Sequence, residues 1–340
     1  MGIKKYVLAA FLMSALCATA HDGVENGDTT DVFEGEVFVE TNYGHKYYDN
    51  HRALFDFPHI ALSGTLQTGH GFSVVAEFEY ERFRENSEWG NSFKENFATN
   101  KLYVNKAFSK ALNLKGGIID VPVGLTNTGG AALTIYDPES EAGLLPMTWH
   151  GTGVSLWGEW RDWRYEVSAL AYLDLPFKRS GMLGMSFRTD YYGLAEGLRM
   201  GVSGYWGKSS CGMVGRCKAG DFVGTDGVFF GAFDCEYVAN GWIVDGSAIL
   251  CSDENAQSAG VEVGYDFASL FGDAARRMSF IPFVRYDGVF ADAARNKLTV
   301  GANISPLPNL VFKAEYSSRR VCGMCTENTI DVGVSYVLDI

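Results

Sequence analysis

The feature that most constrains the fold of this chain is an alternation of apolar and polar side chains with a period of two residues. In one segment Val74 and Phe78 fall on one face, while Glu77, Glu79 and Glu81 fall on the other. Successive side chains of a β-strand point to opposite faces, so the pattern predicts strands with one apolar and one charged face. The alternation returns at 261–267, 298–304, 310–317 and 330–339.

The alternating segments have the length that a tilted membrane-spanning strand needs, about 9–11 residues. An apolar face that meets lipid and a polar face that meets a water-filled lumen account for strands with so little apolar surface on one side. The fold class predicted is therefore all-β, a transmembrane antiparallel barrel. We expect about sixteen strands, near residues 35–43, 53–66, 71–84, 97–109, 112–122, 151–160, 162–174, 182–192, 197–208, 226–239, 241–252, 256–269, 277–290, 295–305, 308–319 and 327–339.

The connections between these segments support a barrel of the outer-membrane kind. Joins near 67–70, 110–111 and 240 are brief, whereas those near 85–96 and 209–225 are long. Outer-membrane barrels have short periplasmic turns and longer outer loops, and an even strand number puts both chain ends in the periplasm. Two connections, 253–255 and 291–294, are short where the pattern predicts long outer loops.

The first 20 residues have the three parts of a secretory signal peptide. Lys4 and Lys5 precede the apolar run 6–16, and Ala18-Thr19-Ala20 forms a cleavage site. A lipoprotein signal at Cys17 is the alternative, which Leu16 disfavours because that processing prefers a small residue there. We expect residues 1–20 to be removed, 21–34 to form a short N-terminal segment, and 35–340 to form the barrel.

Charge narrows the classes of partner. Removal of Lys4 and Lys5 leaves 26 of the 28 basic residues against 41 acidic ones, a balance of −15. Such a chain repels nucleic acid, because phosphate backbones are bound by Lys and Arg. The expected partners are the lipid bilayer and small polar solutes.

The longest connection, 123–150, is the third outer loop, and a resemblance to a known family centres on it. VPVGLTN at 121–127, PES at 138–140 and LPMTW at 145–149 resemble the third-loop region of the phosphate-selective porin O/P-like family. LRMGVSGYWG at 198–207 and FIPFVRYD at 280–287 are similar to later strands of that family. The resemblance implies a sixteen-stranded, trimeric porin of the outer membrane, general or anion-selective. In such porins the third loop folds inward and narrows the pore.

The charges predicted to face inward favour cations instead, because anion-selective pores carry Arg or Lys at the constriction. The predicted inward acids outnumber the predicted inward bases, and the third loop adds three more acids. The predicted constriction sets these loop acids opposite strand-borne bases and comprises Asp137, Glu139, Glu141, Lys101, Arg188 and Arg285. The other predicted lumen-lining residues are Glu77, Glu79, Glu81, Arg199, Glu262, Lys313 and Glu315.

Some residues allow an interpretation other than a role in the pore. Cys211, Cys217, Cys322 and Cys325 lie in two outer loops, and export makes disulfides there the favoured interpretation over a zinc or redox site. The loop acids form no complete calcium-binding pattern, so neither a metal nor a cofactor is expected.

Two other functional classes remain open. One is a structural or adhesive barrel with a blocked lumen, whose cysteine-bearing outer loops bind a partner. The other is an outer-membrane hydrolase, for which Ser63 and His59 share one strand face, but no G-x-S-x-G motif is present. The favoured interpretation is a non-enzymatic porin for passive diffusion of small hydrophilic solutes or ions.

Overall fold

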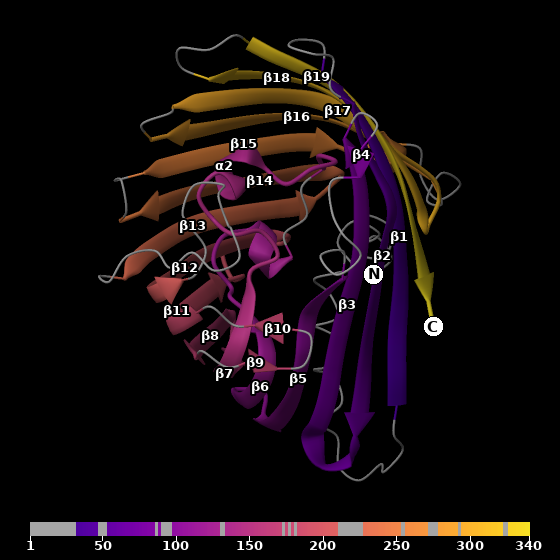
Figure 1. Cartoon of the computed structure of the whole chain (residues 1–340). Coiled ribbons are helices and arrows are strands. Elements are labelled where there is room, and N and C mark those ends of the chain that lie inside the picture. The colour runs from indigo at the N-terminus through magenta and orange to yellow at the C-terminus, as the bar shows by residue number, and fades with distance from the viewer. Residues whose placement is uncertain are drawn as a thin grey trace.

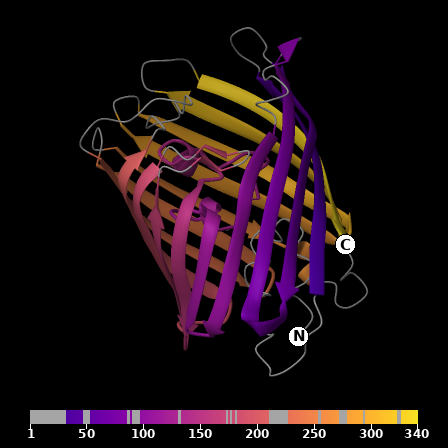
Figure 2. The same cartoon turned by 60° about the horizontal axis from the view of Figure 1, so that its bottom comes forward.

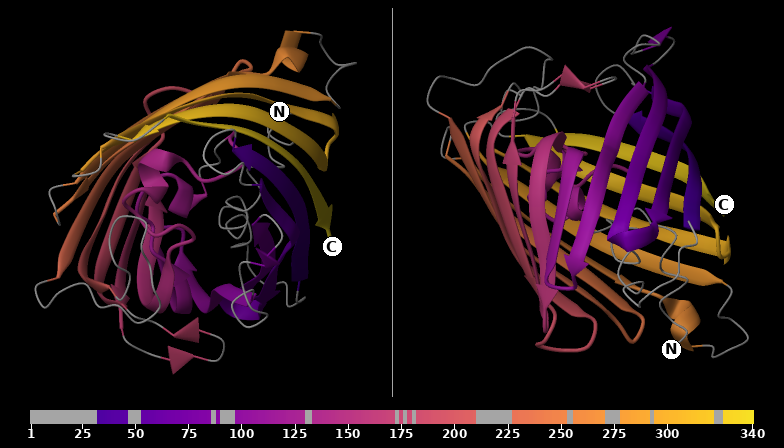
Figure 3. Two further views of the ribbon diagram at one scale, coloured as in Figure 1. Left: turned by 45° about the horizontal axis from the view of Figure 1, so that its top comes forward. Right: turned by 90° about the horizontal axis from the view of Figure 1, so that it is seen from below.

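A computed structural model of the chain contains one closed antiparallel β-barrel (Figure 1). β1 pairs with both β2 and β19, so the sheet has no open edge. The views along and across the barrel show the same ring of strands (Figure 3). The structure describes residues 32–46, 53–85, 88–89, 97–129, 133–171, 174–175, 178–179, 182–209, 227–252, 256–270, 278–291, 294–321 and 326–340.

Within these residues, sixteen long strands form the wall. They are β1 (Val32–Lys46), β2 (Ala53–Thr68), β3 (Phe72–Glu85), β5 (Phe97–Ser109), β6 (Leu112–Asp120), β7 (His150–Trp160), β8 (Trp163–Leu170), β11 (Met182–Tyr191), β12 (Leu198–Ser209), β13 (Val228–Ala239), β14 (Trp242–Cys251), β15 (Gln257–Tyr265), β16 (Ser279–Phe290), β17 (Arg295–Leu307), β18 (Leu310–Val321) and β19 (Thr326–Asp339). Of the two-residue strands, β4 (Glu88–Trp89) pairs with β3 in the same sheet, whereas β9 (Asp174–Leu175) and β10 (Lys178–Arg179) pair with each other in a separate sheet. The helices are α2 (Glu139–Ala142) and short 3₁₀ turns at Gly69–Gly71, Thr126–Thr128 and Phe267–Leu270.

The prediction of a sixteen-stranded barrel is confirmed, and each expected segment corresponds to one long strand. Most strand ends agree with the prediction to within two residues, and the larger differences are at both ends of β1 and at the C-terminal ends of β8 and β15. β1 begins at Val32, inside the expected N-terminal segment 21–34, because 32–34 pair with β2. The expected strand 256–269 ends at Tyr265, because the Asp266 carboxylate accepts hydrogen bonds from the backbone N–H groups of Ala268 and Phe280 and bends the chain. The expected signal peptide and the cleavage site lie outside the described residues.

The two faces of the strands separate as the alternation predicted. On β17, Leu298, Val300 and Ile304 are exposed on the outside, whereas Thr299 and Asn303 are buried on the inside. The outward side chains form an apolar surface around the barrel, and most of the inward ones are charged or polar. Among the described residues, no helix is both long and apolar enough to cross a membrane.

Tight turns join consecutive strands at one end of the barrel (Figure 2). Asn240 and Gly241 connect β13 to β14, and both have positive φ, 53° and 83°. This is the backbone of the two-residue hairpin whose twist matches that of the strands, and Asn-Gly is its preferred sequence. Gly241 is required there, since a side chain would be strained at that φ and would meet Ser269.

Candidate functional site

The candidate site is the inner surface of the barrel together with the segment between β6 and β7. In Figures 1 and 3, α2 and the coil beside it lie within the ring of strands. The backbone N–H of Leu133 donates to Glu262 of β15 at 2.7 Å, and that of Ile135 donates to Glu315 of β18 at 2.9 Å. The segment therefore bonds directly to inward carboxylates of strands far away in sequence.

Helix α2 is held by its own set of contacts. The Ser140 hydroxyl donates to Asp287 of β16 at 2.7 Å. Gly260 of β15 makes this approach possible, because a Cβ there would stand 2.3 Å from Ser140 Oγ and 2.5 Å from Asp287 Oδ1. Only glycine leaves room for the helix at this point of the wall.

Ion pairs tie the start of α2 to two further strands. Glu139 pairs with Arg295 of β17, and with Arg319 of β18 at 2.9 Å. Although burial alone would raise the pKa of Glu139, these two guanidinium groups hold it below its ordinary value. Glu139 is therefore a charged tether between the loop and the wall.

Among the residues that the structure describes, the neighbouring acid Asp137 has no such cation. It keeps contact with solvent while the barrel surrounds it. This enclosure, followed by the charges of Glu141 and Glu79, raises the pKa of Asp137 to about 6. Asp137 is thus a loop carboxylate that titrates near neutral pH.

Both ends of the segment are fixed by buried groups. The carboxylate of Glu141 accepts hydrogen bonds from the backbone N–H groups of Leu125 and Thr126, at 2.9 and 2.8 Å. Trp149 packs on Tyr205 and Phe230, with ring centroids 4.9 and 5.5 Å apart. These contacts belong to a buried apolar cluster between the segment and the wall.

The inner faces of β11–β18, which the segment contacts, form a surface that we call the loop-bearing wall. Two buried arginines there pair with carboxylates of several strands. Arg188 pairs with Asp190 and Asp234, each at 2.7 Å, and donates to the Gly124 carbonyl. In a second cluster, Arg285 pairs with carboxylates of its own and the neighbouring strands. Its partners are Asp245, Glu262 and Asp287, and its side chain is only 1% exposed.

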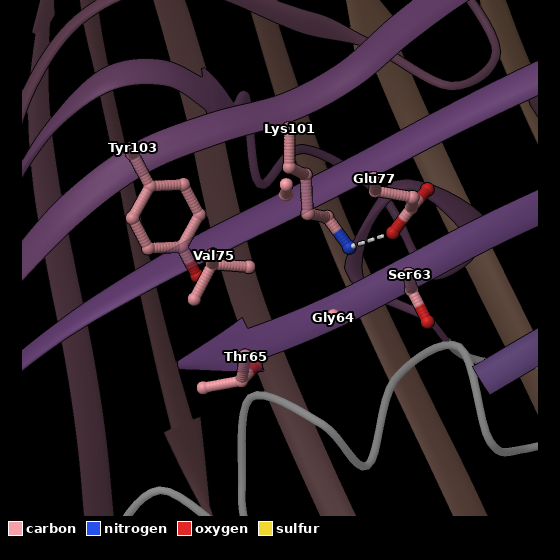
Figure 4. Close-up of a pocket in the computed structure, with 8 residues that line it drawn as sticks. Ser63, Gly64, Thr65, Val75, Glu77, Lys101 and Tyr103 are labelled. Atoms are coloured by element: carbon pink, nitrogen blue, oxygen red, sulfur yellow. Dashed lines mark ion pairs between the residues drawn. The ribbon is translucent and has the colours of Figure 1, made fainter. Parts of the chain in front are cut away.

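The inner faces of β1–β3 and of the adjacent β5 form a second surface, which we call the acidic wall. Its inward carboxylates are Glu36, Glu40, Asp56, Glu77, Glu79 and Glu81. Lys101 of β5 pairs with Glu77 at 2.9 Å beside a small pocket (Figure 4). The pocket is lined by Ser63, Gly64, Thr65, Val75, Ala76, Glu77, Lys101 and Tyr103.

The sequence predicted that loop acids would lie opposite bases of the strands at the constriction, and the structure places these residues in other pairs. Glu139 pairs with Arg295 and Arg319, which the sequence analysis did not single out because they lie near strand ends. Glu141 is fully buried and bonded within its own segment. These two acids therefore have partners other than the predicted ones, and their carboxylates are not gathered as a calcium site would require.

The predicted bases also differ among themselves. Arg188 and Arg285 are buried among carboxylates of the wall, so neither meets solvent in the lumen. Lys101 alone keeps some exposure, with 14% of its side chain accessible. The remaining predicted lining residues, Glu77, Glu79, Glu81, Arg199, Glu262, Lys313 and Glu315, lie on inner faces, where Arg199 pairs with Glu236 and Lys313 donates to the Thr134 carbonyl.

Sequence reasoning missed Asp56, Glu40 and His59 as lining residues. Asp56 and His59 are three residues apart, a spacing that places side chains on opposite faces of a regular strand. Their common inward direction depends on an irregular strand, for which the sequence offers only Pro58 as a signal.

The cysteine prediction lies outside the described residues, since these do not include 211, 217, 322 and 325. Cys235 and Cys251 are described, and Cys235 carries a free thiol. Cys235 follows the inward Asp234 on β13, so it lies on the outer face.

Comparison with known proteins places the fold. The chain resembles OprB of Pseudomonas putida at high pH with a TM-score of 0.63, at 10% identity, over 91% of this chain and 94% of that one. It resembles an anion-selective porin from Comamonas acidovorans with a TM-score of 0.62, at 11% identity, over 91% and 100%. It resembles OmpT, a Vibrio cholerae outer membrane protein in its trimer form, with a TM-score of 0.62, at 10% identity, over 91% and 100%.

No family model matches the chain, and no curated protein matches it. Identities near 10% establish the fold alone. The chain therefore has the fold of outer-membrane porins, and its resemblance to the phosphate-selective porin O/P-like family stays a prediction.

Proposed function

We propose that this protein is a porin of an outer membrane, through which small hydrophilic solutes and ions diffuse passively. The observation that carries the proposal is the contrast between an apolar outer surface and an inner surface of charged side chains. A barrel of about sixteen strands is wide enough for an aqueous channel. The comparisons support the proposal through their fold, and a homotrimer is the assembly we propose with it.

In this proposal the segment between β6 and β7 narrows the channel. Its hydrogen bonds to Glu262, Glu315 and Asp287 support this role, because they hold it across the inside of the wall. Glu139 and Asp137 would present charge to passing ions, while Arg188 and Arg285 hold the segment in place. The acidic wall and Lys101 would form the opposite side of the passage.

Passive diffusion is favoured over catalysis by the position of the one serine–histidine combination noted in the sequence. Ser63 and His59 lie four residues apart on an extended strand, where about 13 Å separates their α-carbons. A nucleophile and its base need hydrogen-bond contact, about 2.6–3.2 Å. The imidazole of His59 bonds to Glu79 at 2.6 Å instead.

Single-channel conductance of the refolded protein in a planar bilayer, with a salt gradient, tests the proposal. We expect open steps whose reversal potential favours cations, because inward carboxylates outnumber bases on the acidic wall. Steps favouring anions would overturn the cation preference and support the phosphate-type resemblance. A folded barrel without conductance would overturn the pore itself and favour an adhesive barrel with a blocked lumen.

A further inference from the structure

An irregularity in β2 gathers side chains that a regular strand would separate. The register of β2 against β3 shifts between Asp56 and His59, and its register against β1 shifts at the same place. The one extra residue in β2 turns both side chains to the inner face. His59 lies directly between Glu40 of β1 and Glu81 of β3, its partners on the neighbouring strands. Figures 1 and 2 show these three strands side by side.

The imidazole of His59 is fixed in one orientation. Its Nε2 lies 2.6 Å from Glu79 Oε1, and the other oxygen of Glu79 accepts a hydrogen bond from Asn100 at 2.7 Å. A carboxylate only accepts, so Nε2 carries the hydrogen of this bond. Nδ1 then faces Asp56 Oδ2 at 3.6 Å and Glu40 Oε2 at 3.7 Å. A carboxylate on one ring nitrogen and a free second nitrogen is the arrangement of histidines that bind metals.

Two atoms of this cluster are buried without a hydrogen-bond partner in the described part of the chain. They are Nδ1 of His59 and Oδ1 of Asp56, and the Asp56 side chain is only 5% exposed. Buried polar atoms are nearly always satisfied, because an unsatisfied one costs about 1–3 kcal/mol. Both atoms belong to the same cluster, so one ligand bound there would satisfy them together.

The geometry fits a small divalent cation. One ligand atom each from Asp56, His59 and Glu81 lie within 4.8 Å of one another. Ligands of a tetrahedral Zn²⁺ stand about 2.0–2.2 Å from the metal and hence about 3.3–3.6 Å apart. The separations of Nδ1 from the carboxylate oxygens of Asp56 and Glu40 are close to this value.

We propose that Asp56, His59 and Glu81 bind a divalent transition-metal ion on the acidic wall, with His59 Nδ1 as the nitrogen ligand and Glu79 as the group that orients the imidazole. An imidazole together with carboxylates favours Zn²⁺ over Ca²⁺ and Mg²⁺, which prefer oxygen ligands alone. Glu40 is placed to supply a fourth ligand. The site needs only the fold and is independent of whether the barrel conducts.

Calorimetry with Zn²⁺ on the full chain, refolded in detergent, stripped with a chelator and alkylated at its cysteines, tests the proposal. We expect about one Zn²⁺ per chain, as for a single three- or four-ligand site. His59→Ala should weaken binding by about 100-fold and Glu81→Gln by about tenfold, the range that loss of metal-site groups causes. Co²⁺ should show visible absorption in the parent protein that His59→Ala removes.

His70→Ala is the matched control, because His70 is exposed at the other end of β2 and should leave Zn²⁺ affinity unchanged. His59→Gln is the second variant should His59→Ala fold poorly, since its amide still donates to Glu79 but offers no ring nitrogen. Equal Zn²⁺ affinity in the parent and a folded His59 variant would overturn the proposal, as would absence of Zn²⁺ binding by the folded parent. Because no current is measured, failure of the pore proposal leaves this result unaffected.

Discussion

The loop-bearing wall and the acidic wall line the same barrel but neutralise their charges differently. On the loop-bearing wall, Arg285 contacts three carboxylates, and the segment between β6 and β7 covers them. On the acidic wall, Lys101 and His59 pair with Glu77 and Glu79, and all four side chains keep some exposure. The difference teaches that the loop-bearing wall holds the segment between β6 and β7, whereas the acidic wall keeps its charges accessible from the lumen.

Removal of the central arginine should give the largest loss of stability. Arg285→Met leaves Asp245, Glu262 and Asp287 buried without their cation, and breaking a buried pair in this way costs about 3–5 kcal/mol. Denaturant unfolding of the refolded barrel measures the free energy of unfolding. Lys101→Met on the acidic wall is the matched variant and should cost about 1 kcal/mol, since solvent weakens its pairs. Equal losses would contradict the contrast between the walls.

The addition of one methyl group to the loop-bearing wall should give the second largest loss of stability. Gly260→Ala puts a Cβ within 2.5 Å of Ser140 and Asp287, and overpacking of this kind costs about 1–3 kcal/mol. Gly116→Ala is the control, because its Cβ would meet Val154 at an ordinary 3.5 Å. Both are measured by denaturant unfolding, and a Gly260→Ala barrel as stable as the Gly116→Ala one would show that α2 is not tightly seated.

Loss of the tether at Glu139 should free the segment while the barrel stays folded. Glu139→Gln removes the ion pairs with Arg295 and Arg319, and hydrogen bonds to charged groups contribute about 1.5–3 kcal/mol. We expect faster protease cleavage between β6 and β7 and, if the barrel conducts, larger conductance steps. Glu327→Gln is the control, because it removes a different ion pair of Arg319 and leaves Glu139 in place. Unchanged cleavage in Glu139→Gln would argue against the tether.

The smallest expected effect is a dependence of ion selectivity on pH. With its pKa raised to about 6, Asp137 is charged at pH 7 and takes up a proton as the pH falls to about 5. The loop then loses one negative charge, and the cation preference measured by reversal potential should decrease. In Asp137→Asn this step near pH 6 should be absent. A step of the same size in that variant would assign the titration to another group.

The strand pattern of this protein could be predicted from its sequence because the information is local. Each strand carries its own alternation, as Leu298, Val300 and Ile304 illustrate, and lipid on one side with water on the other imposes it independently on every strand. Where a local rule was broken, prediction erred. Asp266 ended a strand through hydrogen bonds from the backbone N–H groups of Ala268 and of Phe280, the latter fourteen residues away.

The candidate site was predictable only in part. The third loop and the inward direction of Glu77, Glu79 and Glu81 follow from length and alternation. The pairing of Glu139 with Arg319, 180 residues apart, could not be predicted, because the sequence does not indicate which strand the loop contacts. The inward direction of both Asp56 and His59 was equally inaccessible, since it depends on a register shift between strands.

The sequence by itself determined that this chain forms a barrel with an apolar outside and a charged inside, because side-chain alternation depends only on neighbouring residues. The tertiary structure alone decided which of the inner charges meet. Closure of β1 on β19 and the path of the segment between β6 and β7 bring together groups such as Leu133 and Glu262, 129 residues apart. Those encounters depend on the stagger of all sixteen strands, a property of the whole barrel that no single strand contains.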